Sequence, residues 1–336
     1  MKYAASRAIA LLCSAVICAF AGSAQAADCG TAPKVTIAEM SWLSASTLAR
    51  VTQHILKSGY GCNVELMPGD TVPTATSMLT RSQPNIAPEL WVSTTQDIWN
   101  SIRKKGNVYK ANDVFASGAQ EGLWVPDYLL KENPQIKSVE DLKANWKVFA
   151  SEENPSKGRI YSSPPGWASE IVIANLYKAL GLQQTFELFS PGSGEALKAS
   201  IARAVARHQP FIGYYWAPTE VIAKYHLVRM DMPAYDAEKF VCLTKDSCSN
   251  PQVTGWKSPE VVVAATSNLK TTAPDVATFL SKFQVPNDKL NELLAWGSTN
   301  GATPEQVSQR FLKQYSNVWT AWVPADVAKK VQASLQ

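Results

Sequence analysis

Alternating strand and helix patterns are clearest in residues 35–92, which are VTIAEMSWLSASTLARVTQHILKSGYGCNVELMPGDTVPTATSMLTRSQPNIAPELWV. Short apolar runs at 35–38, 63–67 and 87–92 are bounded by polar or turn residues, which is typical of buried strands. Between the first two runs, apolar residues recur at helical spacing up to Gly59, a residue that commonly ends a helix. A shorter helix-like run precedes the third strand. This strand–helix–strand–helix–strand order predicts a mostly parallel sheet with helices on its faces.

The same alternation continues to the end of the chain. Further strands are expected at 123–125, 159–161, 187–189, 210–216 and 261–265, with helices at 169–180, 193–207, 275–283 and 289–296. The last expected helix opens with TPEQ at 303–306, a capping threonine, a first-turn proline and a capping-box glutamine.

This order of elements favours two α/β lobes joined by two chain crossings. We expect residues 1–26 to be a leader, 27–119 to begin the first lobe, 120–257 to form the second lobe, and 258–336 to return to the first lobe with C-terminal helices. In such a layout the crossings act as a hinge, and a ligand binds in the cleft between the lobes.

The first 26 residues have the pattern of an export signal. Lys2 and Arg7 precede an uncharged apolar run at 9–21, and Ala24-Gln25-Ala26 is a small-x-small cleavage sequence. The context of Cys18 disfavours a lipid anchor. Since no later stretch is long and apolar enough to cross a membrane, we expect a soluble, periplasmic protein.

The net charge argues against one class of partner. The leader carries two basic and no acidic residues, so the charge of +4 falls to +2 after cleavage. This is too weak to indicate nucleic acid or an anionic surface as a partner.

Four cysteines remain in the mature chain, as suits an oxidising compartment. Three pairings are possible. The short spacing of Cys242 and Cys248 favours a disulfide-closed loop, which leaves Cys29 to pair with Cys62. The alternative is a zinc site, which is disfavoured because there is no C-x-x-C and no neighbouring histidine. We therefore expect no metal and no cofactor.

Three tryptophans lie where strands are expected to give way to loops. Trp91 lies in PELWVSTT, Trp167 in PPGWASE and Trp216 in GYYWAPT. Trp42 follows the first strand at the same rim and is a candidate fourth wall. Several indole faces that converge on one point can bind a quaternary ammonium cation by cation–π attraction.

Motifs in a fixed order along nearly the whole mature chain resemble the substrate-binding proteins of ABC importers for glycine betaine, proline betaine and choline. They are IAEMSW at 37–42, MPGD at 67–70, the run at Trp91, GAQEGLWVPDY at 118–128, Gly166-Trp167, GYYWAP at 213–218 and NVW at 317–319. The resemblance implies a two-lobe, type II-like periplasmic-binding-protein fold and an aromatic ligand box. It also implies a monomer whose partners are a membrane permease and an ATPase.

The resemblance is incomplete around the box. A cysteine that follows the Gly-Trp turn in some relatives is absent, since Ala168, Ser169 and Glu170 stand there. Thr94 and Thr95 stand where some members have a histidine. Recognition of the ligand's other end is therefore not fixed by the family pattern.

Two helix-start residues are candidates for reading a ligand carboxylate. Backbone N–H groups of Ala168 and Ser169 begin a predicted helix, and such N-termini bind anions. The Ser169 hydroxyl would add a donor or cap the helix. Glu170 is expected to point away, because it would repel a carboxylate.

Four further acidic or aromatic residues adjoin the rim. Tyr214 and Tyr215 alternate across a strand, so at most one faces the cleft, and Tyr215 is the candidate. Glu39 and Glu89 could balance the charge of a cation, although solvated or hinge-bonding roles are favoured. Glu39 is retained as a candidate ligand residue.

Rival functions are an enzyme, a sensor that presents its ligand to a receptor, or a binding protein of the same fold for a different amine or amino-acid-like ligand. The three histidines, His54, His208 and His226, lie in or near helix patterns, and no G-x-S-x-G, H-E-x-x-H, P-loop or G-x-G-x-x-G is present. An enzyme is therefore not expected.

Overall fold

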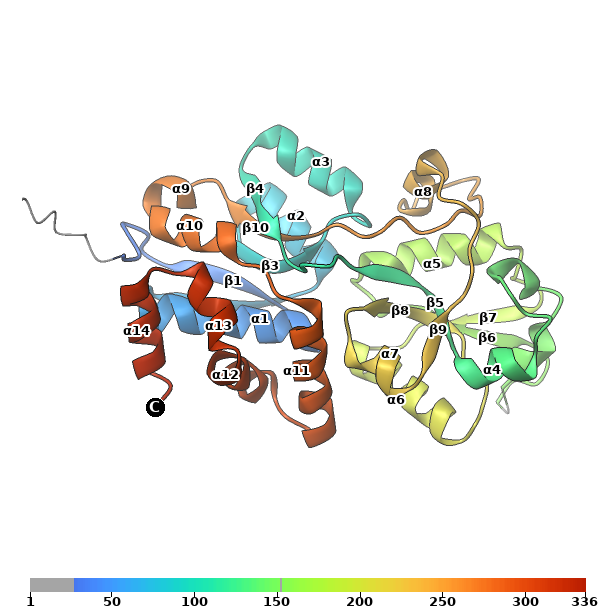
Figure 1. Cartoon of the computed structure of the whole chain (residues 1–336). Helices are drawn as coiled ribbons and strands as arrows, with labels where there is room; N and C mark the ends of the chain where they lie inside the picture. Colours follow the sequence, from blue (N-terminus) through green and yellow to red (C-terminus); the bar gives the residue numbers. More distant parts are fainter. Residues whose placement is uncertain (1–26, 152) are drawn as a thin grey trace, which may run out of the picture.

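The computed structural model describes residues 27–151 and 153–336, so the predicted leader lies outside the described residues. The chain forms two lobes, each built on a five-stranded sheet flanked by helices (Figure 1). The strand orders are β2-β1-β3-β10-β4 and β7-β6-β8-β5-β9. The predicted α/β class with two sheets is therefore confirmed.

The first sheet contains one reversed strand. Its members are β1 (Val35–Met40), β2 (Val64–Gly69), β3 (Ile86–Trp91), β4 (Val108–Asp113) and β10 (Val261–Thr266). β1 pairs in parallel with β2 and β3, whereas β10 runs antiparallel to β3 and β4. The first residue of β10, Val261, lies opposite the last residue of β3, Trp91.

The second sheet has the same arrangement. Its members are β5 (Gln120–Pro126), β6 (Gly158–Tyr161), β7 (Phe186–Phe189), β8 (Gly213–Ala217) and β9 (Leu227–Arg229). β6 pairs in parallel with β7 and β8, and β5 runs antiparallel to β8 and β9. Gln120 lies opposite Ala217, so β5 starts where β8 ends.

The two reversed strands, β5 and β10, are each the first strand after a chain crossing. A strand that arrives from the other lobe enters at the edge facing that lobe, where the parallel strands end. It must therefore run in the opposite direction. In each sheet, therefore, four strands run in one direction and one strand runs in the opposite direction.

Helices cover both sheets. In the first half of the chain they are α1 (Leu43–His54), its π-helical continuation η1 (Ile55–Gly59), α2 (Thr71–Arg81) and α3 (Gln96–Lys105). The second lobe carries α4 (Asp127–Glu132), η2 (Val139–Asp141), η3 (Trp146–Phe149), α5 (Ala168–Ala179), α6 (Gly194–Ala206), α7 (Glu220–Lys224) and α8 (Ala237–Leu243).

The C-terminal region has more helices than the sequence pattern predicted. It contains α9 (Leu269–Thr272), α10 (Pro274–Lys282), α11 (Asn287–Asn300), α12 (Pro304–Gln314), α13 (Ser316–Trp319), η4 (Thr320–Trp322) and α14 (Ala325–Ala333). The predicted capping box of Thr303 and Gln306 is present at the start of α12. However, α12 is not the last helix, because α14 follows it and packs against η1.

Both expected disulfides are present. Cys29–Cys62 joins the segment before β1 to the turn before β2, and Cys242–Cys248 closes a loop after α8. Because all four sulfurs are in disulfides, they cannot serve as zinc ligands. Within 27–151 and 153–336, no helix has the length and apolar character needed to cross a membrane.

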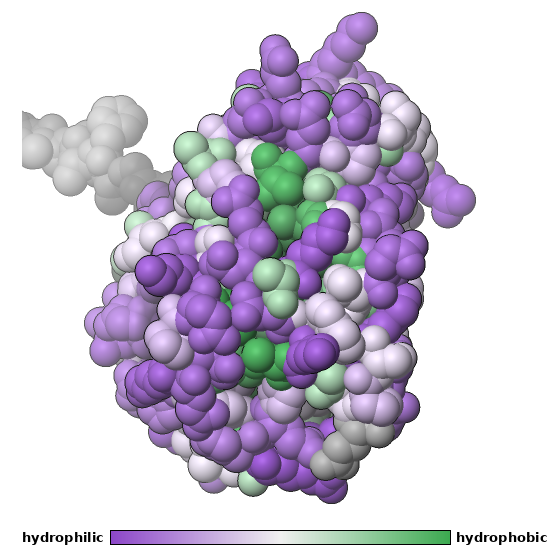
Figure 2. Space-filling model, turned by 90° about the vertical axis from the view of Figure 1, so that its right-hand side faces the viewer, coloured by the Kyte–Doolittle hydropathy of each residue, from purple (hydrophilic) through white to green (hydrophobic). Residues whose placement is uncertain are grey.

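The outer end of the second lobe is largely hydrophilic. Figure 2 looks onto this end and shows only small, separated apolar areas. Among the described residues, the large apolar side chains classed as exposed are Phe189, Val228 and Tyr235, each about two-fifths exposed.

Candidate functional site

A pocket of about 280 Å³ lies between the two lobes. The first lobe contributes Trp42, Thr71, Trp91 and Thr94, and the second contributes Glu121, Trp167, Ala168, Ser169, Tyr214 and Trp216. Half of these side chains are aromatic, and none is lysine or arginine.

Four tryptophans meet at this pocket because their elements end at the facing edges of the two sheets. Trp91 ends β3 and Trp216 lies one residue before the end of β8, while Trp42 and Trp167 are the residues just before α1 and α5. The Trp167 ring lies 5.4 Å from the Trp42 ring and 5.1 Å from the Trp216 ring, with both pairs edge to face. Each of the four is at most 7% exposed.

Glu89 holds the two tryptophans of the first lobe. Its Oε1 accepts hydrogen bonds from Nε1 of Trp42 at 2.6 Å and from Nε1 of Trp91 at 3.0 Å. The Ser44 hydroxyl donates to the same oxygen at 3.1 Å. Glu89 is buried, and desolvation raises its pKa to about 7 despite these hydrogen bonds. The role of Glu89, which the sequence left open, is thus to orient the indole rings of Trp42 and Trp91.

Trp167 connects the lobes. Its Nε1 donates to Asp70 Oδ1 at 3.2 Å and to Ser41 Oγ at 3.3 Å, both across the cleft. Beside it, the Val72 N–H donates to the Gly166 carbonyl at 3.2 Å. Gly166 has a φ of +88°, a left-handed conformation that favours glycine. The turn before α5 therefore reaches the first lobe directly, and α11 also contacts α7 across the cleft. The lobes are closed on one another.

Glu121 is a pocket residue that sequence reasoning missed. It lies on β5 opposite Trp216 and is 2% exposed. Its Oε1 accepts a hydrogen bond of 2.6 Å from the Tyr214 hydroxyl. Its Oε2 is buried and has no hydrogen-bond partner in the described part of the chain. Burial raises the pKa of Glu121 to about 7. The available signal was an acidic residue at the start of an otherwise apolar strand.

The tyrosine that faces the pocket is Tyr214, so the choice of Tyr215 is corrected. Side chains alternate along β8, and Tyr214 shares its face with Trp216. Tyr215 instead lines a neighbouring recess with Lys198 and Glu220, which form an ion pair of 2.9 Å. Tyr214 and Tyr215 therefore line different recesses between the lobes, and only Tyr214 lines the aromatic pocket.

Ala168 and Ser169 line the pocket at the first turn of α5. The Ser169 hydroxyl hydrogen-bonds to the Ser163 hydroxyl at 2.9 Å, and no side chain caps the helix. Glu170 is not among the pocket-lining residues.

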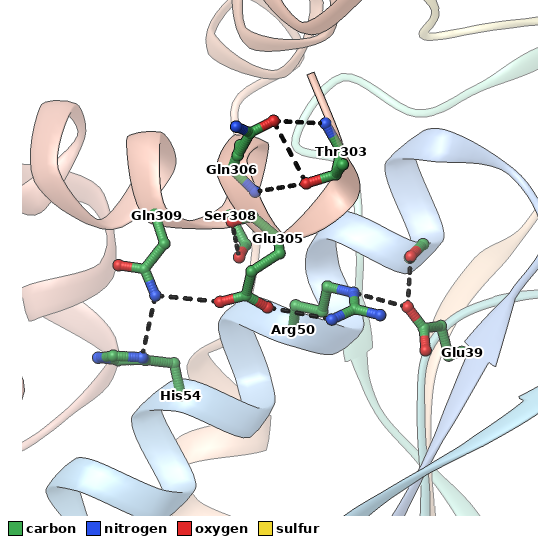
Figure 3. A network of polar contacts seen from close by, with 9 residues as sticks. Glu39, Arg50, His54, Thr303, Glu305, Gln306, Ser308 and Gln309 are labelled. Atoms are coloured by element: carbon green, nitrogen blue, oxygen red, sulfur yellow. Dashed lines mark hydrogen bonds and ion pairs between the residues drawn. The ribbon is translucent and has the colours of Figure 1, made fainter. Parts of the chain in front are cut away.

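Glu39 does not line the aromatic pocket but lines a neighbouring recess between the lobes. Its carboxylate accepts a hydrogen bond from Arg50 Nε at 2.7 Å (Figure 3). It also accepts one from the Ser46 hydroxyl at 2.6 Å. Arg50 also pairs with Glu305 on α12 at 3.0 Å. The guanidinium between two carboxylates joins β1, α1 and α12, so Glu39 stabilises the first lobe.

Comparisons with known proteins agree with this architecture. A family model described as the substrate binding domain of an ABC-type glycine betaine transport system matches residues 33–314. An ABC-transporter choline binding protein in complex with choline is 19% identical, with a TM-score of 0.72 and coverage of 90% of this chain and 98% of that one.

Two further solved structures have the same fold. A lactococcal protein in its closed, liganded conformation with glycine betaine is 18% identical, with a TM-score of 0.67 over 87% of this chain and all of that one. A glycine betaine, L-proline binding protein from Borrelia burgdorferi is 16% identical, with a TM-score of 0.70 over 89% and 99% of the two chains.

Proposed function

Because the chain belongs to the family of substrate-binding domains of ABC-type glycine betaine transport systems, we propose that its four-tryptophan pocket captures a quaternary ammonium solute. The family is one of transport proteins rather than enzymes. The observation that carries the proposal is the convergence of Trp42, Trp91, Trp167 and Trp216 on one pocket.

The pocket suits the chemistry of such a ligand. A trimethylammonium group has no N–H to donate, and its charge is spread over methyl surfaces. Indole faces offer it dispersion contact and a negative quadrupole, at roughly 0.5–2 kcal/mol for each good contact. Several such contacts together with methyl burial are compatible with micromolar affinity, about −8 kcal/mol.

Two further polar features of the wall would meet the ligand's other end. Backbone N–H groups of Ala168 and Ser169 at the start of α5 suit a carboxylate. The carboxyl group of Glu121 suits a hydrogen-bond donor. Glycine betaine, proline betaine and choline share the cationic head and differ at this end.

The proposal includes the protein's place in the cell. The export-signal pattern of residues 1–26 supports a periplasmic location, and family membership supports delivery of the solute to a membrane permease and its ATPase. The largely hydrophilic surface in Figure 2 is compatible with a monomer.

A thermal-shift and calorimetric screen tests the proposal. The mature protein is titrated with choline, glycine betaine, proline betaine, carnitine, free amino acids and a polyamine. A ligand at 100 times its Kd adds about 2.7 kcal/mol of stability, which raises Tm by several degrees. We expect shifts only with quaternary amines. Shifts confined to amino acids or polyamines would replace the proposal with a different ligand on the same fold.

Two tryptophan variants test whether this pocket binds the ligand. Trp167→Ala and Trp216→Ala should each weaken binding by up to about 30-fold, because each removes one indole contact worth roughly 0.5–2 kcal/mol. Trp146→Ala is the matched control, since Trp146 lies on η3 and does not line the pocket. Full binding by both pocket variants would contradict the proposed box.

A further inference from the structure

We propose that Glu121 reads the polar end of the ligand and selects a quaternary ammonium cation with a hydroxyl donor, an amino alcohol of the choline type, over a zwitterion with a carboxylate. The inference rests on the proposed function and names the ligand class within it. Neither the sequence motifs nor the family assigns a role to this residue.

The first argument is an unused hydrogen-bond acceptor. Glu121 lines the pocket, its Oε1 is occupied by the Tyr214 hydroxyl, and its buried Oε2 has no partner among the described residues. Buried polar atoms in folded proteins nearly always have a partner, and an exception at a binding site indicates one supplied by the ligand. A bound cation favours the ionised form of Glu121, whose oxygens only accept hydrogen bonds, so the missing partner is a donor.

The second argument is the position of that acceptor. Glu121 lies directly across the β5–β8 pairing from Trp216, and its partner Tyr214 lies on the same face of β8. The Trp216 ring is in turn 5.1 Å from the Trp167 ring. Because Glu121, Trp167 and Trp216 line the same pocket, a cation against these indole faces would have the Glu121 carboxyl group in the same enclosure.

The third argument is the charge of the walls. The pocket-lining residues include Glu121 and no lysine or arginine. Two more carboxyl groups accept hydrogen bonds from indole N–H groups of the pocket. Glu89 accepts from Trp42 and Trp91, and Asp70 accepts from Trp167. The cation of the adjacent recess, Lys198, is paired with Glu220. A ligand with a net positive charge balances this environment, whereas a ligand carboxylate would add like charge at low dielectric.

The start of α5 is the competing feature, and it is weaker. A helix N-terminus carries the equivalent of roughly half a positive charge. Here Glu170 lies in the first turn and the Ser169 hydroxyl already bonds to Ser163. In the ionised form that a bound cation favours, Glu121 carries a full negative charge and a free oxygen, and this outweighs the partial positive charge of the helix start.

Calorimetric titration of the wild-type protein with three matched ligands tests the inference. Choline carries the hydroxyl donor, its O-methyl ether keeps the charge but lacks the donor, and glycine betaine replaces the hydroxyl with a carboxylate. We expect choline to bind at least about tenfold more tightly than either, because a hydrogen bond to a charged group is worth at least that factor.

The variant Glu121→Gln completes the design. It should weaken choline binding about tenfold, leave the ether nearly unchanged, and bring glycine betaine close to choline. Glu140→Gln is the matched control, because Glu140 is exposed on η2 and does not line the pocket, and it should leave the ranking intact. The wild-type comparison decides the matter even if Glu121→Gln fails to fold.

The outcomes distinguish failure of the inference about Glu121 from failure of the proposed function. Equal binding of choline and its ether, tighter binding of glycine betaine by the wild-type protein, or an unchanged ranking in Glu121→Gln would each overturn the inference while preserving the proposed function. Failure of all three ligands to bind would overturn both.

Discussion

At the scale of single residues, the pocket depends on two buried carboxyl groups. Glu89 orients the rings of Trp42 and Trp91, and Glu121 pairs with Tyr214. Burial raises the pKa of both to about 7. A site for a cation thus holds acids whose ionised forms are costly when no ligand is bound.

These pKa values predict opposite pH dependences for folding and for binding. Between about pH 4.5 and 7 the folded state holds protons on Glu89 and Glu121 that the unfolded state has lost. The two groups therefore stabilise the ligand-free protein at low pH, and this contribution is lost as pH rises through 7. A bound cation favours the ionised forms, so affinity should rise from pH 5.5 to 8.

Denaturant unfolding of the wild-type protein and of Glu89→Gln/Glu121→Gln, each at pH 5 and 8, measures the first effect. The stability difference between wild type and variant should shift against the wild type at pH 8. Calorimetric titration with choline across the same range measures the second. A choline affinity that falls as pH rises would contradict this account.

The residues also show where sequence reasoning succeeds. The positions of Trp91, Trp167 and Trp216 could be predicted because breakers and small residues mark the ends of the preceding elements. Local sequence does not determine which of two adjacent strand residues faces the pocket, so it could not distinguish Tyr214 from Tyr215. The place of Glu121 in the pocket could not be predicted from local sequence, because it depends on Tyr214 and Trp216 on the neighbouring strand.

At the scale of elements, strands and helices with a clear apolar pattern were predictable, whereas β4, β9, α3 and α14 were not. β4 and β9 border their sheets, and α3 has only Trp99 and Ile102 as buried residues. α14 was missed although Val327 and Val331 are fully buried, because its apolar face is defined only by what it packs against. That partner is η1, which ends at Gly59.

Gly59 provides a test of this helix contact. A Cβ at Gly59 would lie 2.6 Å from Val327 Cγ1, so Gly59→Ala should destabilise the protein by about 1–3 kcal/mol. Tm should fall by a few degrees. Val327→Ala removes the obstructing methyl groups and should recover part of the loss in the double variant.

Gly192→Ala is the control, since no atom lies within 4 Å of its added Cβ. Differential scanning calorimetry of the four proteins gives the coupling. If the effects of Gly59→Ala and Val327→Ala simply add, the two residues are not in contact and the docking of α14 is wrong.

At the scale of the whole molecule, binding is coupled to closure because the pocket has walls from both lobes. The strongest link is the Trp167 Nε1 group, which donates to Asp70 and Ser41 of the first lobe. It is joined by the Val72–Gly166 backbone hydrogen bond and by an ion pair of 3.3 Å between Lys245 and Asp97. Trp167 therefore both lines the aromatic pocket and holds the two lobes together.

Trp167→Phe separates these two roles. The variant keeps an aromatic face for the cation but loses the cross-cleft hydrogen bonds, so the closed form should lose stability. We expect ligand affinity to fall about tenfold, mostly through faster dissociation. Small-angle X-ray scattering at saturating ligand should show a larger radius of gyration for Trp167→Phe than for the wild-type protein.

Trp216→Phe makes the same change of ring but keeps the hydrogen bonds that Trp167 makes across the cleft. It should weaken binding without changing the radius of gyration at saturation. Identical scattering and dissociation rates for the two variants would mean that closure is driven by the ligand alone, and that the indole N–H of Trp167 contributes nothing to it.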